Sequence, residues 1–327
     1  MITMKQMGVT FGLLAGILSA GTAMAQTQMR LAVETTGGDP TNVMLSAFRD
    51  ELKKTAGDSV AIEFFDGGAL GDEFALSELL RAGQVEVIPL GSDGIVALDS
   101  KFSIFDTPFL FSGKEQARTA LDGKLGALMT ASLRDKANLE VLAFGELGVR
   151  VISNSKRAIV VPADLQGLKI RTPNSPTRMM AFETFGASPT NLALGEVYMG
   201  LKQGVIDGQE NPLSVIKEFS LYEAQAHISL TNHIYTPITL VMNGTAFNAL
   251  PDDLKAKVKA AAAASVAKTR TLSDESDASL VAEFEKAGVT VTKPDIAAFR
   301  TAAEPVKAKI AEVVTAEFVT EVEGALQ

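Results

Sequence analysis

The chain has 327 residues, with 30 Lys and Arg, 39 Asp and Glu, and no cysteine. A chain without cysteine has no disulfides, redox thiols or thiolate metal ligands, and a net charge of −9 argues against nucleic acids and anionic membrane surfaces as partners. An anionic ligand stays compatible with this charge, because screening over roughly 8 Å lets nearby arginines set the potential of a buried site.

The first 25 residues have the pattern of a secretory signal peptide. One basic residue, Lys5, precedes an apolar stretch from Val9 to Ala20, and Ala23-Met24-Ala25 forms a small-x-small cleavage site. The apolar stretch is shorter than the roughly 20 residues that span a bilayer, which favours a cleaved signal over a membrane anchor. We therefore predict a mature periplasmic chain that begins at Gln26 and is not inserted in the membrane.

The mature chain exceeds the ~250 residues at which single hydrophobic cores tend to split, so we expect two lobes. In its first part, strand patterns alternate with helix patterns, which predicts βαβ units and a mainly parallel sheet. The predicted strand and helix pairs are 29–34 with 42–55, 60–65 with 72–82, and 85–90 with 115–137.

The middle of the chain predicts strands that cross between the lobes. Residues 139–144 and 150–153 form two strand patterns separated by Gly145 and Gly148. A short strand at 168–171 then leads to Ser175, a candidate N-cap of the next helix.

The last part begins with strands at 229–233 and 236–243. The segment Leu250-Pro-Asp-Asp253 predicts the start of a long helix that ends near Glu285. A short strand at 289–291 and one or two helices over 294–326 complete the chain. We predict lobe I from residues 26–147 plus 237–276, and lobe II from 148–236 plus 277–327.

The sequence contains no recognisable catalytic or metal-binding motif, so we expect neither a cofactor nor a metal site. The two histidines, His227 and His233, are six residues apart, a spacing that suits neither a helical metal pair nor the exclusive ligand set of a single strand face, and each is interpreted as structural.

Three polar residues are candidates for an anion site. Arg171 lies at the C-terminal end of a predicted strand, where open α/β sheets bind ligands, and a guanidinium can hold a carboxylate through two parallel hydrogen bonds. A solvent-facing arginine is the alternative. Arg150 is interpreted as a second cation or as an inter-lobe salt bridge, and Asn211 as a ligand contact or as a helix cap.

Six segments together resemble the DctP-type solute receptors of tripartite ATP-independent periplasmic (TRAP) transporters. They extend over nearly the whole mature chain: Gly68–Glu73, Phe105–Phe111, Pro162–Arg171, Phe185–Pro189, Gly195–Pro212 and Thr231–Pro237. The resemblance implies a periplasmic-binding-protein-like fold of two α/β lobes, joined by crossing hinge strands and a long connecting helix. It also implies closure of the lobes on a solute that passes to a membrane permease.

The resemblance implies that Arg171 anchors the ligand carboxylate, with Asn211 and Arg150 beside it. The variable positions that line such a cleft include Glu34, Asp72, Ser92, Asn174 and Leu194. We add Tyr235, within the last of the six segments, to the expected ligand contacts. A carboxylate at Glu34 suits a ligand with hydroxyl or amino donors and disfavours a second ligand carboxylate.

We therefore predict a monomeric extracytoplasmic receptor for a small organic acid. A hydroxylated monoacid is favoured over dicarboxylates, 2-oxo acids and sulfonates. One alternative is a sensory module that presents its bound ligand to a signalling partner. The other is a periplasmic hydrolase or lyase that uses Asp72 or Glu73 as acid and base, although no nucleophile is paired with a base.

Overall fold

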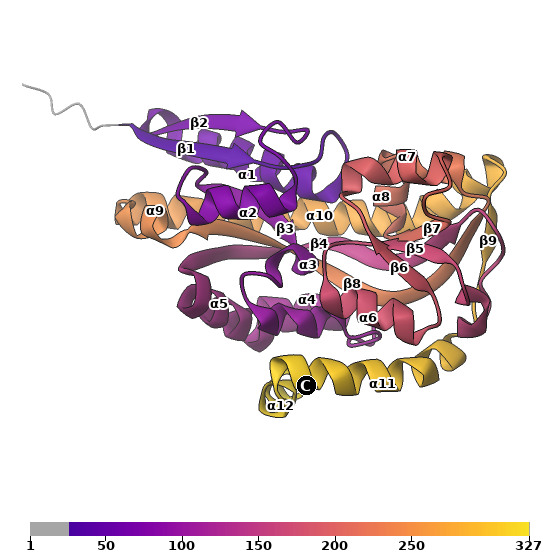
Figure 1. The fold of residues 1–327 in the computed structure, drawn as a ribbon. Helices are drawn as coiled ribbons and strands as arrows, with labels where there is room; N and C mark the ends of the chain where they lie inside the picture. The colour runs from indigo at the N-terminus through magenta and orange to yellow at the C-terminus, as the bar shows by residue number, and fades with distance from the viewer. Residues whose placement is uncertain (1–25, 327) are drawn as a thin grey trace, which may run out of the picture.

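The computed structural model describes residues 26–326, so the predicted signal peptide, residues 1–25, lies outside the described residues. Helices cover a central sheet on both faces (Figure 1). None of the helices between residues 26 and 326 is long and apolar enough to span a membrane.

The sheet has nine strands in the order β2-β1-β3-β8-β4-β7-β5-β6, with β9 paired to β8. The strands are β1 (Thr27–Ala32), β2 (Val60–Phe65), β3 (Val87–Gly91), β4 (Leu139–Asn154), β5 (Lys169–Thr172), β6 (Ser188–Asn191), β7 (Gly208–Asn211), β8 (His227–Asn243) and β9 (Thr290–Thr292). Pairing is parallel at both ends of the sheet, among β1 to β3 and among β5 to β7. The strands that join these ends are antiparallel, namely β8 to β3, β8 to β4 and β4 to β7.

Most of the α-helices pack against this sheet, and α12 packs on other helices. They are α1 (Pro40–Ala56), α2 (Glu73–Arg81), α3 (Ser92–Ile95), α4 (Lys114–Asp122), α5 (Lys124–Ala137), α6 (Pro176–Thr184), α7 (Val197–Lys202), α8 (Leu213–Glu218), α9 (Gly244–Ala249), α10 (Asp252–Lys286), α11 (Ile296–Val314) and α12 (Ala316–Ala325). Five short 3-10 helices are η1 (Gly57–Ser59), η2 (Ser100–Asp106), η3 (Pro162–Leu165), η4 (Leu194–Glu196) and η5 (Leu221–Ala224).

The crossing between lobes differs in detail from the prediction. Each predicted pair of short strands is one long strand, β4 with 16 residues and β8 with 17. Register shifts in β4 between Glu146 and Gly148 let the strand continue through a local kink. Gly148 has a φ of 129°, and a Cβ at Gly145 would lie 2.6 Å from the sulfur of Met44. Glycine is therefore required where the strand bends and where α1 packs closely on it.

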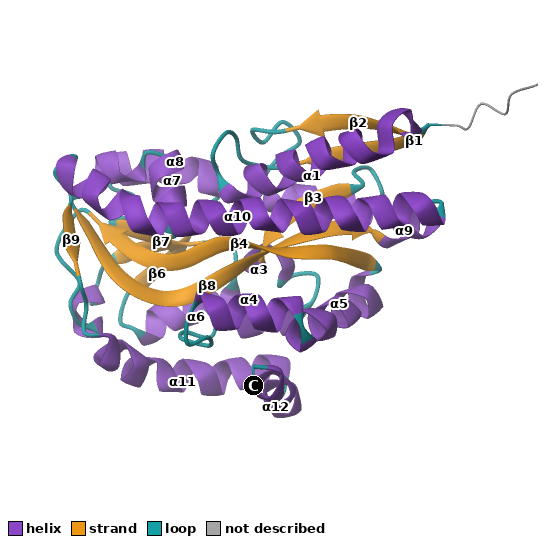
Figure 2. Cartoon of the chain, turned by 180° about the vertical axis from the view of Figure 1, so that it is seen from behind, coloured by secondary structure: helices purple, strands orange, loops and turns teal. Residues whose placement is uncertain are grey.

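The long connecting helix is present as predicted and runs along the whole sheet (Figure 2). Helix α10 has 35 residues and contacts α1 and β4 near one end of the molecule and α8 and β9 near the other. The predicted helix 115–137 is instead two helices, α4 and α5, that meet at Gly123. The cap at Ser175 is confirmed, because its side chain accepts from the Arg178 amide.

Four apolar cores lie between the sheet and its helices. Two of them surround β1, β3 and the first half of β4, and the other two surround the second half of β4 with β5. Helix α11 contacts both η2 and α6, and α12 packs on α5. The C-terminal helices thus connect both halves of the molecule, and the predicted lobe boundaries stay a prediction.

Candidate functional site

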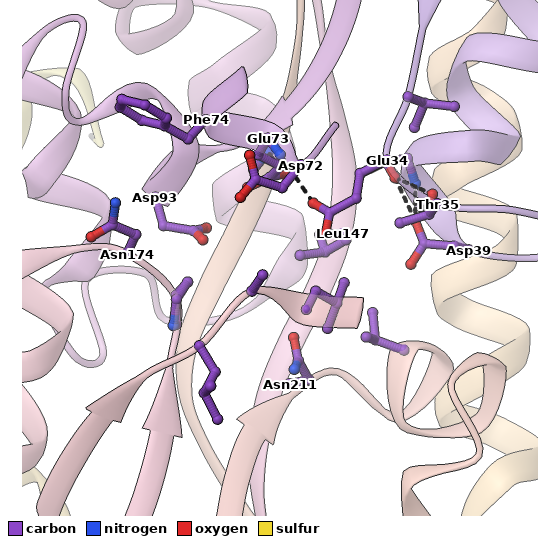
Figure 3. A pocket seen from close by; sticks show the side chains of 18 of the residues that line it. Glu34, Thr35, Asp39, Asp72, Glu73, Phe74, Asp93, Leu147, Asn174 and Asn211 are labelled. Atoms are coloured by element: carbon purple, nitrogen blue, oxygen red, sulfur yellow. Dashed lines mark hydrogen bonds between the residues drawn. The ribbon is translucent and has the colours of Figure 1, made fainter. Parts of the chain in front are cut away.

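A cavity of about 170 Å³ lies where the ends of β1, β3, β5 and β7 face each other. Most of the predicted contact residues line it: Glu34, Asp72, Arg150, Arg171, Asn174, Leu194 and Asn211. In Figure 3, Glu34, Asp72 and Glu73 lie on one side and Asn211 on the facing side. The carboxyl ends of parallel strands place these side chains together, as open α/β sheets do with their ligand sites.

Arg171 is a buried cation without an acidic partner. Its side chain is at the end of β5, the residue is 4% exposed, and its Nε and Nη2 donate to the Leu192 carbonyl at 2.9 and 2.7 Å. It forms no ion pair with any residue of the described range 26–326. Burial, followed by the positive charge of Arg150, lowers the pKa of Arg171 to about 10. Glu210, Asp93 and Glu34 oppose this shift from a distance, and the guanidinium stays protonated at neutral pH.

Arg150 lies next to Arg171 and is fixed by neighbouring groups of β7. Its Nε donates to the Glu210 carboxylate, and its Nη2 donates to Glu210 Oε1 at 2.9 Å and to Asn211 Oδ1 at 2.8 Å. Asn211 in turn donates to Gln209 Oε1 at 2.6 Å. Helix α8 begins after Pro212 without a side-chain cap, so the predicted alternative of Asn211 as a cap is wrong. The structure brings Asn211 to the cavity with both arginines.

Behind this pair, Glu210 is the centre of a buried charge network. Burial alone raises the pKa of Glu210, but Arg150 and Arg178 reverse the shift and hold it below the ordinary range. Arg178 also pairs with Asp106 at 2.6 Å, and His233 Nε2 lies 3.3 Å from Glu210. Burial lowers the pKa of His233, which makes this ring neutral at pH 7. The network positions Arg150 and leaves Arg171 as the uncompensated charge.

Acidic residues form the opposite wall of the cavity. Asp72 caps α2 by accepting from the Ala75 amide at 2.9 Å, and Glu34 accepts from the Glu73 amide at 3.1 Å. Burial raises the pKa of Glu34, and burial with the charges of Asp93 and Glu34 raises the pKa of Glu73 well above its usual value. The side chain of Glu73 also accepts from the Gly91 amide at 3.3 Å.

Two predicted contacts lie elsewhere. Ser92 begins α3 and is fully buried, yet it does not line the cavity. Tyr235 lines a different cavity, and its hydroxyl donates to the Glu146 carboxylate at 3.2 Å. Burial raises the pKa of Tyr235, so this hydroxyl stays protonated.

The prediction of site residues also missed groups that the structure places at the cavity. Glu73 and Asp93 line it, and the Leu192 carbonyl holds Arg171 there. Asp93 follows the buried strand β3 by two residues, a position at the ligand edge of a sheet that would have identified it. No comparable signal marks a backbone carbonyl.

A polar contact joins the two sides of the cavity at its margin. The carboxylate of Glu218, at the end of α8, accepts from the Gly38 amide at 3.0 Å. A Cβ on Gly37 would lie 2.6 Å from this carboxylate, and Gly37 has a φ of 57°. The loop before α1 therefore approaches α8 closely only because these positions are glycine.

The arrangement is suited to binding and not to bond cleavage. Arg150, Arg171 and Asn211 face a wall of five carboxyl groups, those of Glu34, Asp39, Asp72, Glu73 and Asp93. No serine or cysteine of the described chain lines the cavity as a nucleophile paired with a base. Among residues 26–326, no group of three or more His, Asp or Glu side chains is placed to hold a metal ion. Such a cavity can hold a small anion at one end and hydroxyl donors at the other.

Comparisons with known proteins identify the family. The model for "Bacterial extracellular solute-binding protein, family 7" matches residues 31–313. A solute-binding protein of Verminephrobacter eiseniae is 37% identical over 289 residues, 88% of this chain and 86% of that protein. The 2,3-diketo-L-gulonate-binding periplasmic protein YiaO of Escherichia coli is 34% identical over 290 residues, 88% of each chain.

A solved structure agrees in fold. The crystal structure of a TRAP periplasmic solute-binding protein from a Polaromonas species, bound to D-erythronate, has a TM-score of 0.87 and 30% identity, and covers 91% of this chain and 98% of that chain. This confirms the predicted two-lobed α/β fold. The comparisons also contradict the hydrolase or lyase alternative, because these relatives are binding proteins. The chain belongs to family 7 of the bacterial extracellular solute-binding proteins, the solute receptors of TRAP transporters, and it is a binding protein, not an enzyme.

Proposed function

We propose that this protein is a periplasmic receptor for one hydroxylated monocarboxylic acid of the sugar-acid class. The acid binds in the cavity between the lobes, with its carboxylate at Arg171 and beside Arg150 and Asn211. The closed receptor then delivers it to the membrane permease of a TRAP transporter.

The burial of Arg171 without an ion-pair partner among residues 26–326 is the main support for this proposal. A buried guanidinium without an ion-pair partner is costly for a folded protein, and here a second guanidinium adds to the cost. A ligand carboxylate would remove this cost and accept the hydrogen bonds that Arg171 and Arg150 still offer to the cavity. A planar guanidinium recognises a carboxylate by two parallel hydrogen bonds, which explains arginine at this position.

The acidic wall supports the class of acid. Glu34, Asp72, Glu73 and Asp93 offer oxygens that accept from hydroxyl groups, and the raised pKa of Glu73 favours a protonated carboxyl that can also donate. A second carboxylate on the ligand would lie against these acids and would be repelled. Leu194 and Leu147 supply apolar contacts for a carbon chain.

The known ligands of two relatives agree with this class. One relative is named for 2,3-diketo-L-gulonate and another was crystallised with D-erythronate. Each of these compounds carries hydroxyl groups and a single carboxyl group, and the first is a 2-oxo acid as well. We propose the same class for this chain and leave the individual acid to experiment.

A thermal-shift screen of the purified mature chain tests the ligand class. The library would contain aldonates, uronates, four-carbon dicarboxylates, 2-oxo acids and sulfonates. A ligand present at 100 times its dissociation constant stabilises the folded state by ~2.7 kcal/mol. We expect the largest shifts from aldonates or uronates, and larger shifts from dicarboxylates would contradict the proposal.

Calorimetric titration with the best acid of the screen then tests the role of Arg171. Removing one partner of a buried charge pair costs ~2 to 5 kcal/mol, so Arg171→Ala should weaken binding at least about thirtyfold. The matched control is Arg81→Ala, which removes an exposed arginine of α2 that pairs only with Glu78. Unchanged affinity in Arg171→Ala would refute the assignment.

Three further predictions belong to this function. We propose that residues 1–25 are cleaved during export, that the mature chain is a monomer, and that the lobes are 26–147 plus 237–276 and 148–236 plus 277–327. The change from parallel to antiparallel pairing at the crossing strands β4 and β8 supports a division of the sheet into two parts. Light scattering of the purified protein would test the monomer.

A further inference from the structure

A second cavity lies away from the anion site, and we call it the rear cavity. It has a volume of about 440 Å³ and an apolar lining of Phe111, Val149, Leu213, Leu230 and Val281. This volume is within the range of ~300–1,000 Å³ common for small-molecule sites. Two of the six segments singled out in the sequence meet here, since Phe105–Phe111 contributes its last residues and Thr231–Pro237 contributes His233 and Tyr235.

The backbone is strained at the edge of the rear cavity. Phe109 has a φ of 59° and Asn232 a φ of 46°, and both line the cavity. A bulky residue with positive φ is unusual and persists only where neighbouring contacts enforce it. Here the Phe109 amide donates to the His233 carbonyl at 2.8 Å. This hydrogen bond fixes the backbone at Phe109, whose side chain lines the cavity beside Arg300.

Two cations line the rear cavity, and only one of them has acidic partners among the described residues. Lys114 lies within salt-bridge distance of Asp277, at 2.5 Å, and of Glu146 and Asp274, both at 3.4 Å. Arg300 is exposed, and its guanidinium lies 4.7 Å from the centre of the Phe109 ring. It has no ion pair with any residue from 26 to 326. Arg300, at the rim of an apolar cavity, is therefore the cation that an anionic group of a ligand would contact.

The rear cavity and the anion site lie on opposite faces of the same strand. Val149 and Arg150 are neighbours in β4, so their side chains point to opposite faces, one toward each cavity. His233 lines the rear cavity and also contacts Glu210, which holds Arg150. The rear cavity is thus on the far side of the crossing strands from the anion site.

This position connects the rear cavity to hinge closure. Residues 109–114 belong to predicted lobe I, whereas Leu213, Leu230 and Val281 belong to predicted lobe II. Rotation about strands that separate two cavities widens one cavity while it narrows the other. Opening the anion site would therefore compress the rear cavity, and a molecule that fills the rear cavity opposes that opening.

We propose that the rear cavity is a second ligand site for an amphipathic monoanion, an aromatic or branched carboxylate or sulfonate, whose occupancy favours the closed lobes. The apolar body lies against Phe111, Leu213 and Leu230, and the anionic group lies at Arg300. A ligand that binds one of two arrangements more tightly shifts the equilibrium toward it, so rear and front ligands strengthen each other's binding. This inference goes beyond the proposed function and does not depend on the identity of the front ligand.

Fluorescence titration with 1-anilinonaphthalene-8-sulfonate, an aromatic monoanion, tests the site directly. We expect saturable binding that is weakened roughly two- to fivefold by Arg300→Gln, the size of effect typical of an exposed ion pair. Arg81→Gln, at an exposed arginine outside the cavity, should leave this affinity unchanged. Absence of saturable binding, or equal affinity in Arg300→Gln, would overturn the proposal.

A wedge variant tests the coupling without any ligand. Val281→Trp, or Val281→Phe if the larger ring impairs folding, fills the rear cavity from α10. We expect a smaller radius of gyration by X-ray scattering in the absence of added acid, together with loss of dye binding. The control Val313→Trp adds the same ring at an exposed position of α11. A radius of gyration that is unchanged or larger in a folded wedge variant would contradict the coupling.

Discussion

Two buried arginines in the same part of the fold differ in their partners, which predicts opposite effects of one substitution. Arg171 is 4% exposed and lacks an ion pair among residues 26–326, whereas Arg178 is 0% exposed and pairs with both Asp106 and Glu210. Replacement of either residue by methionine removes the charge and keeps an unbranched apolar stem. The two variants therefore compare an uncompensated with a compensated guanidinium.

The expected change in the free energy of unfolding of Arg171→Met follows from the pKa of Arg171. A pKa that falls from 12.5 to about 10 means that the folded chain disfavours the charged form by about 3 kcal/mol. This cost is fully present at pH 7, because the guanidinium stays protonated below its pKa. Loss of the two hydrogen bonds to the partly exposed Leu192 carbonyl costs ~1 kcal/mol. Arg171→Met should thus raise the free energy of unfolding of the ligand-free protein by about 1 to 2 kcal/mol.

Arg178→Met should have the opposite effect. It leaves the carboxylates of Asp106 and Glu210 without their shared cation, and breaking a buried ion pair costs ~3 to 5 kcal/mol. Urea denaturation at pH 7, followed by circular dichroism in the absence of any acid, measures both variants. If Arg171→Met were less stable than the wild type by more than about 1 kcal/mol, Arg171 would not be an uncompensated charge and the reasoning would fail.

Further predictions concern the acids, the amide and the signal. The raised pKa of Glu73 means that the folded chain binds this proton more tightly than the unfolded chain does, so the contribution of Glu73 to stability falls as pH rises above 4.5. Glu73→Gln should therefore make the melting temperature depend less on pH between about pH 4.5 and 8. The lowered pKa of Glu210 has the opposite sign, and Glu210→Gln should cost ~3 to 5 kcal/mol at pH 7 by urea denaturation, a cost that shrinks on acidification. Asn211→Ala should weaken binding of the best acid by roughly tenfold in calorimetry, the typical cost of a hydrogen bond to a charged group, and equal affinity would contradict its role. Mass spectrometry of a periplasmic extract should give a mature chain that starts at Gln26, and an intact Met1 would refute cleavage.

The sequence predicted the elements whose ends are marked by residues close together in the chain. Pro251 with Asp252 and Asp253 located the start of α10, and Ser175 located the start of α6. Arg171 was predicted as a ligand contact because strand ends of open α/β sheets bind ligands, and the resemblance to a family strengthened that prediction; the structure places it at the cavity. These features depend on residues that are close in the chain, so a single sequence contains the information.

The rest depends on contacts between distant segments. The break between α4 and α5 at Gly123 interrupts a continuous helical pattern, because a Cβ at Gly126 would lie 1.9 Å from the Leu121 carbonyl oxygen, so only glycine fits so tight a turn. Glu73 was interpreted only as a candidate catalytic acid, since its burial against Asp93 and Gly91 involves residues about 20 positions away. Alternation along β8 could not tell which face Tyr235 occupies, because both faces of this strand are buried.

The place of β8 in the sheet has a consequence for synthesis. This strand, His227–Asn243, pairs with β3 on one side and β4 on the other, so the N-terminal part of the sheet is completed only by residues near position 240. Contacts so distant in sequence form late, because the loop between them must close first. A nascent chain that ends before Asn243 has an incomplete sheet and an uncovered strand edge. The N-terminal half of the sheet therefore cannot be completed until about three quarters of the chain has been synthesised.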